Sequence, residues 1–126
     1  MTNSKGRRRD TLNLKDYLGE TNLYDKKEKL EVNKPKSWLK SVSAFANGSG
    51  GEIIFGIRED NEIVGIEDYQ KDSENISEII KTKMDSVPEF DMIIKEIEGN
   101  VILILSVYQG KHTPYFVIDS GSRTAY

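Results

Sequence analysis

The sequence predicts an α+β fold with two or three helices packed against a mixed, mostly antiparallel sheet. Two segments carry apolar residues at the helical spacing of about 3.6 residues, and several short apolar runs are joined by turn residues in the manner of hairpins. The 126 residues are the usual length of one domain and can bury a core without disulfides or metal ions. We expect a single domain over residues 10–126, preceded by a disordered basic leader over residues 1–9.

The first half of the domain is predicted to contain a short helix, an exposed strand and a longer helix. Residues 11–18 carry leucines and a tyrosine at helical spacing, and Gly19 closes that segment. Residues 23–32 are rich in charge and are predicted to form an exposed or edge strand. The clearest helix begins at Pro35, since proline suits a first turn, and its wide apolar stripe ends near Asn47.

The second half is predicted to contain two hairpins, one more helix and a last strand. The apolar run at residues 52–57 predicts a buried strand, and residues 63–66 return after an acidic turn to form a hairpin with it. Asp72 or Ser73 is predicted to cap the next helix. The remaining strands are predicted at residues 92–97 and 101–107, as a second hairpin, and at residues 115–118.

The composition excludes several classes of chemistry. The chain has no cysteine and one histidine, which excludes disulfides, thiolate metal sites, cysteine nucleophiles and multi-histidine sites. No apolar run reaches the roughly 18 residues of a membrane span, and no signal-peptide pattern opens the chain. We therefore expect a cytoplasmic protein that does not enter a membrane.

The formal net charge of −3 is unevenly distributed along the chain. Residues 59–98 contain 13 acidic residues and 4 lysines, whereas residues 20–40 contain 6 lysines and 4 acidic residues. A net negative charge argues weakly against nucleic-acid binding, because phosphate contact usually requires an excess of Lys and Arg. Because the charge is unevenly distributed, a local phosphate-binding surface is still compatible with the sequence.

The glycine cluster at residues 47–51 has two interpretations. It is neither a Walker loop nor a Rossmann fingerprint, since no Gly-Lys-Ser/Thr follows and the third glycine is absent. It either caps a helix and makes a tight turn, or exposes backbone N–H groups of Gly48, Gly50 and Gly51 to a phosphate.

The basic side chains form the larger candidate site. If they meet on one side of the fold, they make a surface that follows phosphates, with the acidic segment turned away. The alternative is that they only solvate the surface. The candidates for nucleic-acid contact are Lys27, Lys36, Lys40, Arg58, Lys111 and Arg123.

Carboxylates are the other candidate chemistry. Glu20, Asp25 and Asp60 would hold Mg²⁺ or Mn²⁺ for phosphodiester cleavage if folding brought them together, which their spacing does not require. The sequence otherwise predicts no cofactor, and it contains no motif for ATP.

Residues 38–57 carry the most specific pattern, a helix ending in Ala-Phe-Ala-Asn, a Gly-Gly pair and a strand ending in Gly-Ile. An acidic turn and the segment Ile63-Val64-Gly65-Ile66 follow, and Pro114-Tyr115 lies further downstream. With these motifs, the chain resembles the Schlafen AlbA-like DNA-binding domain family over roughly residues 17–126. The resemblance implies the α+β fold of that family and a nucleic-acid-associated role at the front of a longer bacterial regulator or helicase-like protein.

The resemblance also implies site residues. Related domains of animal Schlafen proteins form an RNase site of three carboxylates, to which Glu20, Asp25 and Asp60 correspond here. The family pattern continues beyond a tyrosine at the place of Tyr126, which implies a domain truncated at its C-terminal end. Our leading expectation is a binding domain, not an enzyme, that contacts the DNA backbone for a bacterial transcriptional regulator. The alternatives are a metal-dependent nuclease and an oligomerisation or sensor domain, and a homodimer is compatible with each.

Overall fold

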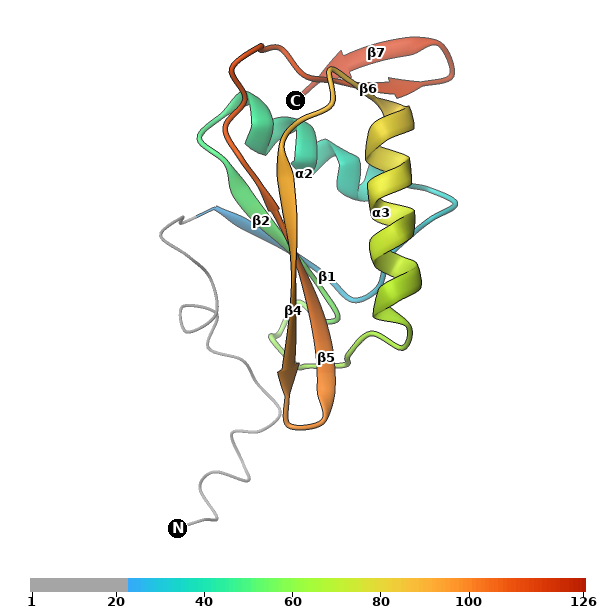
Figure 1. The fold of residues 1–126 in the computed structure, drawn as a ribbon, viewed down its shortest axis with the longest axis vertical. Coiled ribbons are helices and arrows are strands. Elements are labelled where there is room, and N and C mark those ends of the chain that lie inside the picture. The colour runs from blue at the N-terminus through green and yellow to red at the C-terminus, as the bar shows by residue number, and fades with distance from the viewer. Residues whose placement is uncertain (1–22) are drawn as a thin grey trace.

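The computed structural model describes residues 23–126, which form two helices and two sheets (Figure 1). The predicted leader at residues 1–9 and the predicted helix at 11–18 lie outside the described residues. The elements are β1 (Tyr24–Lys27), α2 (Lys36–Asn47), β2 (Gly51–Phe55), α3 (Tyr69–Lys83), β3 (Met84–Asp85), β4 (Phe90–Ile97), β5 (Asn100–Val107), β6 (Phe116–Asp119) and β7 (Ser122–Ala125).

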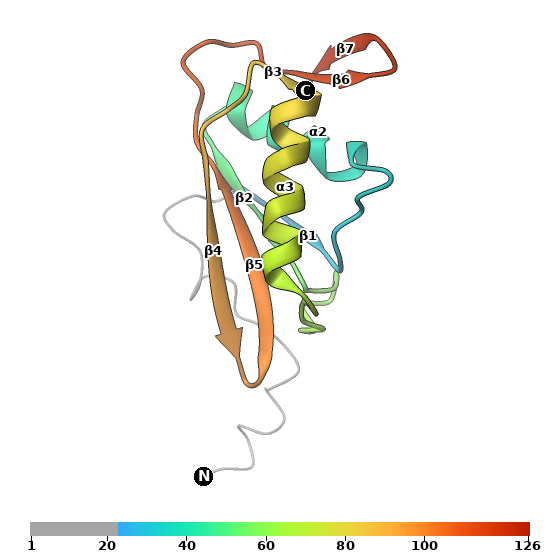
Figure 2. The ribbon, with the colours of Figure 1, turned by 45° about the vertical axis from the view of Figure 1, so that its right-hand side comes forward.

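The larger sheet has the strand order β1-β2-β5-β4. β1 runs parallel to β2, and the β2–β5 and β5–β4 pairs are antiparallel, so the predicted mixed, mostly antiparallel sheet is confirmed. A second sheet of β3, β6 and β7 lies at one end of the molecule, beside the C-terminal end of α3 (Figure 2). The sequence predicted only β6 of this second sheet, at residues 115–118.

α2 forms where the apolar stripe predicted it, beginning directly after Pro35. Its buried residues include Trp38, Leu39 and Val42, which pack toward the larger sheet. The Trp38 ring meets the Phe55 ring edge-on, with centroids 5.9 Å apart, and its Nε1 donates to the carbonyl oxygen of Glu31 at 3.1 Å. This hydrogen bond satisfies the indole N–H that burial would otherwise leave without a partner.

α3 begins earlier than predicted, because its cap is Asp68 and not Asp72 or Ser73. The Asp68 side chain accepts a hydrogen bond from the backbone N–H of Lys71 at 3.1 Å. An aspartate in this position satisfies one of the unpaired N–H groups of the first turn, and the helix continues back to Tyr69.

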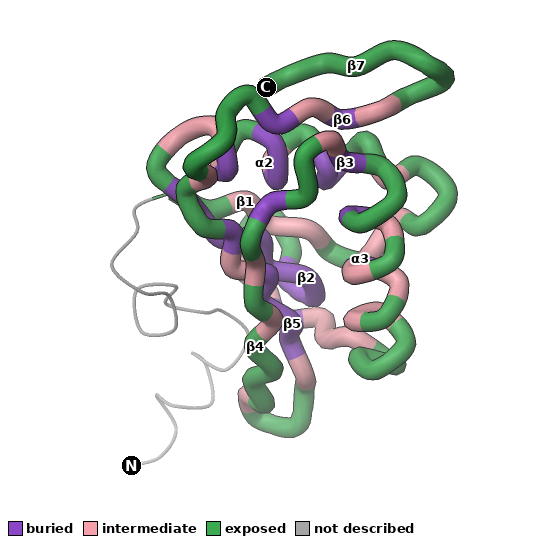
Figure 3. Tube along the Cα trace, turned by 45° about the horizontal axis from the view of Figure 1, so that its top comes forward, coloured by how far each residue is buried: buried purple, intermediate pink, exposed green. Residues whose placement is uncertain are grey.

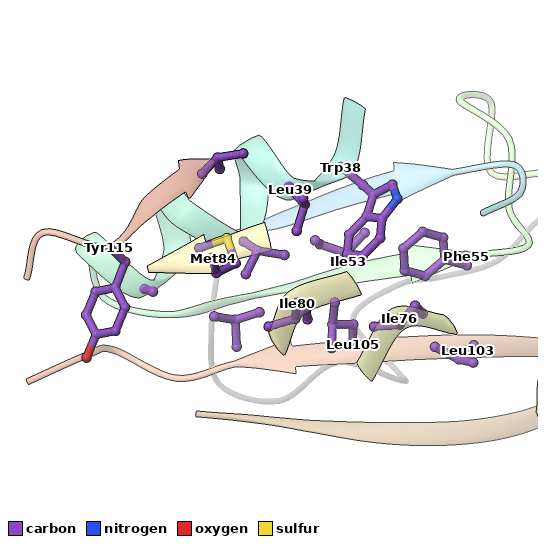
Figure 4. Close-up of a cluster of buried hydrophobic side chains, with 14 residues drawn as sticks. Trp38, Leu39, Ile53, Phe55, Ile76, Ile80, Met84, Leu103, Leu105 and Tyr115 are labelled. Carbon is purple, nitrogen blue, oxygen red and sulfur yellow. The ribbon is translucent and has the colours of Figure 1, made fainter. Parts of the chain in front are cut away.

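Two apolar clusters cover the two faces of the larger sheet. On the helix face, side chains of β2 and β5 meet α2 and α3 (Figure 4). On the opposite face, Ile54 and Ile104 pack with Ile57 and Ile63. The alternation of side chains along each strand separates the two sets.

The predicted hairpin between residues 52–57 and 63–66 is reduced to one bridge, Ile57 to Ile63. Both edges of β2 are already paired, with β1 and β5, so the returning segment cannot join the sheet. The second predicted hairpin is confirmed as β4 and β5, joined by a two-residue turn with positive φ at Glu98 and Gly99. Neither helix in the described part is long and apolar enough to cross a membrane.

Candidate nucleic-acid interface

The C-terminal end of α2 is closed by a network of internal hydrogen bonds. Asn47 Oδ1 accepts from the Tyr115 N–H at 2.6 Å, and Asn47 Nδ2 donates to the carbonyl oxygens of Tyr115 and Tyr126, each at 3.0 Å. The buried Ser43 hydroxyl donates to the Tyr115 carbonyl at 2.8 Å and accepts from the Tyr126 N–H at 2.9 Å. These two side chains therefore fasten the start of β6 and the residue after β7 to the helix.

The glycine loop belongs to this closed end. The N–H groups of Gly48 and Gly50 both donate to the carbonyl oxygen of Phe45, at 3.2 and 2.9 Å. A Cβ on Gly51 would lie 2.6 Å from the Phe45 ring. The geometry supports the cap interpretation, because these N–H groups have an internal partner and a helix C-terminus disfavours anions.

The N-terminal half of α2 is open and is surrounded by lysines from β1, from α2, from the segment between them and from the end of α3. One surface hollow of about 420 Å³ is lined by Lys27, Lys29 and Ser37, together with Glu28 and Glu31. A second, of about 340 Å³, is lined by Lys34, Lys36 and Lys83 together with Asp119. We call this set the lysine surface: Lys27, Lys29, Lys34, Lys36, Lys40 and Lys83.

Three members of the lysine surface pair with carboxylates. Lys27 lies 3.6 Å from Asp25, Lys29 4.0 Å from Glu31 and Lys36 3.4 Å from Asp119. The Lys29 and Lys36 pairs are exposed and therefore worth little in water, so a phosphate can replace their carboxylates at small cost, whereas the Lys27 pair is half-buried. The other three members form no ion pair within residues 23–126: Lys34, Lys40 and Lys83.

The acidic part of the chain is only partly separated from the lysine surface. Lys29 shares a further hollow with Asp68 and Asp72 at the start of α3. Burial raises the pKa of Asp72 above its ordinary value, and the nearby Asp68 adds to the shift while Lys71 opposes it. The start of α3 is therefore an acidic border of the lysine surface.

The other predicted contact residues lie elsewhere. Arg58 follows β2 and pairs with Glu62 at 3.4 Å. Lys111 lies in the loop after β5, which is bonded to the closed end of α2. Arg123 on β7 pairs with Asp85 at 3.2 Å. Of the predicted basic set, the structure gathers Lys27, Lys36 and Lys40 around α2.

The predicted carboxylate set is not assembled by the described residues. Glu20 lies outside them, and Asp25 accepts a hydrogen bond from the Ser41 hydroxyl of α2 at 2.7 Å. The neighbouring strand residue Lys26 points to the opposite face, where its Nζ donates to the Glu59 carbonyl at 2.5 Å, beside Asp60. The Glu59 carbonyl, next to Asp60 in the chain, therefore lies at the face of the sheet opposite to the Asp25 side chain. Within residues 23–126, no three acidic or histidine side chains are placed to hold a metal ion.

The sequence model of the family described as Schlafen, AlbA_2 matches residues 20–126, which include both ends of α2 and both sheets. The chain belongs to this family. This Schlafen AlbA_2 domain also has similar solved structures. One is the N-terminal domain of a Nitrosomonas europaea protein described as related to the ATP-dependent DNA helicase RecG, with a TM-score of 0.64 and 19% identity, covering 88% of this chain and 80% of that one.

A second similar structure comes from Corynebacterium diphtheriae, with a TM-score of 0.56 and 23% identity. The match covers 86% of this chain and 23% of that one, so this domain spans less than a quarter of that protein. At these identities the two structures establish the fold. A search of curated proteins gives no match.

Proposed function

We propose that this Schlafen AlbA_2 domain binds nucleic acid, DNA in particular, by contacts between the lysine surface and backbone phosphates. The observation that carries the proposal is the gathering of six lysines from four segments around the open end of α2. The positive end of the helix dipole lies at the same place and adds to the attraction. The family assignment and the helicase-related name of the Nitrosomonas europaea protein support the same class of partner.

The chemistry of the lysine surface favours affinity over sequence specificity. Lysine ammonium groups on flexible stems bind phosphate as point charges and read no base edges. Three of the six are already balanced by carboxylates, so the surface suits a few phosphates and not a long wrapped duplex. We place this activity at the front of a bacterial transcriptional regulator in the cytoplasm, where the domain would hold the protein on DNA.

The decisive experiment is a titration of fluorescent duplex DNA, followed by anisotropy at several salt concentrations. The paired variants are Lys34→Ala/Lys40→Ala and the control Lys81→Ala/Lys111→Ala, which removes the same charge at residues outside the lysine surface. We expect the first variant to weaken binding by roughly tenfold and to reduce the salt slope by about two, because two phosphate contacts are lost. The control should keep the wild-type slope.

Two outcomes would contradict the proposal. Absence of binding at low salt would contradict the proposed nucleic-acid binding. Equal losses of affinity in both variants would show that the lysine surface is not the binding site. The same titration with duplex RNA tests the preference for DNA, which tighter RNA binding would overturn.

A further inference from the structure

β4 is an end strand of the larger sheet and has no strand beside its outer edge in the described part of the chain. It has eight residues and contains no proline, and its isoleucines Ile93 and Ile94 are 37% and 40% exposed. Figure 3 shows how little of this strand is buried. A long exposed edge of this kind is a template for pairing with another strand.

The direction of the backbone groups on β4 follows from its pairing with β5. The N–H of Tyr108 donates to the carbonyl oxygen of Glu89 at 3.0 Å, so Glu89 directs its backbone groups toward the β5 side. Direction alternates along an antiparallel strand, so Asp91, Ile93 and Lys95 also face β5. The residues that present N–H and C=O groups at the open edge are Phe90, Met92, Ile94 and Glu96.

This alternation restricts how a second copy of the chain could pair with the edge. In an antiparallel pair related by a two-fold axis, edge-facing residues must lie opposite edge-facing residues, so the axis passes through Met92, Ile93 or Ile94. With the axis at Ile93, Asp91 lies opposite Lys95 of the second copy, and the same pair repeats across the axis. With the axis at Met92 or Ile94, Asp91 lies opposite an isoleucine. Charge complementarity therefore selects Ile93.

We propose that two copies of this chain associate through β4, antiparallel and centred on Ile93, so that the larger sheet continues from one copy into the other. Phe90, Met92, Ile94 and Glu96 of each copy then find partners for their outward N–H and C=O groups. Two Asp91–Lys95 pairs flank an Ile93–Ile93 contact, and Met92 packs beside Ile94 of the second copy. The lysine surface lies at the β1 and α2 side of the sheet and stays accessible, so this association does not depend on the proposed function.

A single introduced thiol tests the register, because the natural chain contains no cysteine. At the axis, Ile93 faces itself in a non-hydrogen-bonded pair with Cα atoms about 4.5 Å apart, which is within the range of a disulfide. We expect Ile93→Cys to form a covalent dimer under mild oxidation. The matched control is Ile94→Cys, with nearly the same exposure, which lies opposite Met92 and should form little covalent dimer.

Equal cross-linking of the two cysteine variants, or none in Ile93→Cys, would overturn the register. Charge reversal gives a second test by sedimentation velocity. We expect Lys95→Asp to weaken dimerisation about fivefold or more, since like charges then face each other twice, and the double variant Asp91→Lys/Lys95→Asp to restore it. Circular dichroism confirms that each variant is folded. Failure of the double variant to recover would show that the two residues do not meet.

Discussion

The two ends of α2 differ in almost every physical respect. At the C-terminal end, Ser43 and Asn47 are held by backbone groups of residues more than 60 positions away, and the glycine loop packs against the helix itself. At the N-terminal end, lysines from four segments surround the helix, and half of them form no ion pair within residues 23–126. The most specific sequence motif, at the C-terminal end of α2, therefore stabilises the fold. The N-terminal end, to which we assign binding, has only scattered lysines and no motif.

The difference follows from the ranges of the forces involved. Close packing and hydrogen bonding fix the residue type at each position, because a shift of an ångström removes the interaction. Attraction between a lysine and a phosphate extends over the Debye length, about 10 Å in 0.1 M salt, and tolerates several positions of a flexible side chain. The positions of a lysine binding surface are therefore less restricted in sequence than the positions that pack the fold, and they form a weaker motif.

The largest expected effect is at the closed end, for Gly51→Ala. The new methyl group would lie 2.6 Å from the Phe45 ring, so the ring or the backbone beside it must shift. We expect the free energy of unfolding to fall by about 2–3 kcal/mol, the usual cost of overpacking. Urea denaturation measures it, and Ser49→Ala, two residues earlier at an exposed position, is the control, with a change below about 0.5 kcal/mol. A Gly51→Ala variant as stable as this control would show that the ring moves away freely.

Asn47→Ala should come next. It leaves the Tyr115 N–H and carbonyl with fewer partners and releases the carbonyl of Tyr126. We expect a loss of about 2 kcal/mol, as for buried groups that lose hydrogen bonds. DNA affinity of the folded protein should change less than about twofold, since no phosphate contact is touched. A large loss of DNA affinity in a variant that is still fully folded would show that the C-terminal end of α2 also contributes to the binding site.

Most of the larger sheet and both described helices could be predicted because their signals are local. α2 has a strong apolar stripe after Pro35, and β4 and β5 are joined by a turn with glycine. β7 has no such signal, since all four of its residues are exposed and only pairing with β6 makes it a strand. The loss of the hairpin between residues 52–57 and 63–66 could not be predicted either, because it depends on β1 and β5 occupying both edges of β2.

The residues of the lysine surface likewise include some that could be predicted from the sequence and some that could not. Lys27, Lys36 and Lys40 could be grouped because they are close in sequence on elements that pack together. Lys83 gave no signal, because only the packing of α3 brings it beside Lys36. Arg58 and Arg123 are basic like the others but pair with carboxylates away from α2, which depends on the tertiary fold.

Asp119→Asn tests whether Lys36, at the N-terminal end of α2, contacts phosphate. The substitution removes the carboxylate 3.4 Å from Lys36 and frees that ammonium group for phosphate. Because the pair is exposed, the free energy of unfolding should change by less than about 0.5 kcal/mol. DNA affinity at low salt should rise about two- to threefold, by anisotropy, since one competing negative charge is gone. An unchanged affinity would mean that Lys36 does not reach the phosphates.

The smallest expected effect concerns Asp72, at the acidic border of the lysine surface. Its pKa is raised in the folded protein by burial and by Asp68, four residues earlier, so the folded state holds this proton more tightly than the unfolded state. Stability from this group is therefore complete below the unfolded value of about 3.8 and is lost as the pH rises through the folded pKa. Asp72→Asn does not titrate, and it should exceed the wild type in stability at neutral pH.

The expected gain for Asp72→Asn is about 0.2–0.5 kcal/mol, because it removes a partly buried charge and its repulsion with Asp68, the cap residue four positions earlier. Urea titrations at pH 7 and pH 3.5 measure it, and the difference between variant and wild type should shrink at the lower pH. The same substitution should strengthen DNA binding slightly, because Lys29 shares a hollow with Asp72. A gain in stability without any gain in affinity would place the boundary of the binding surface between Lys29 and the start of α3.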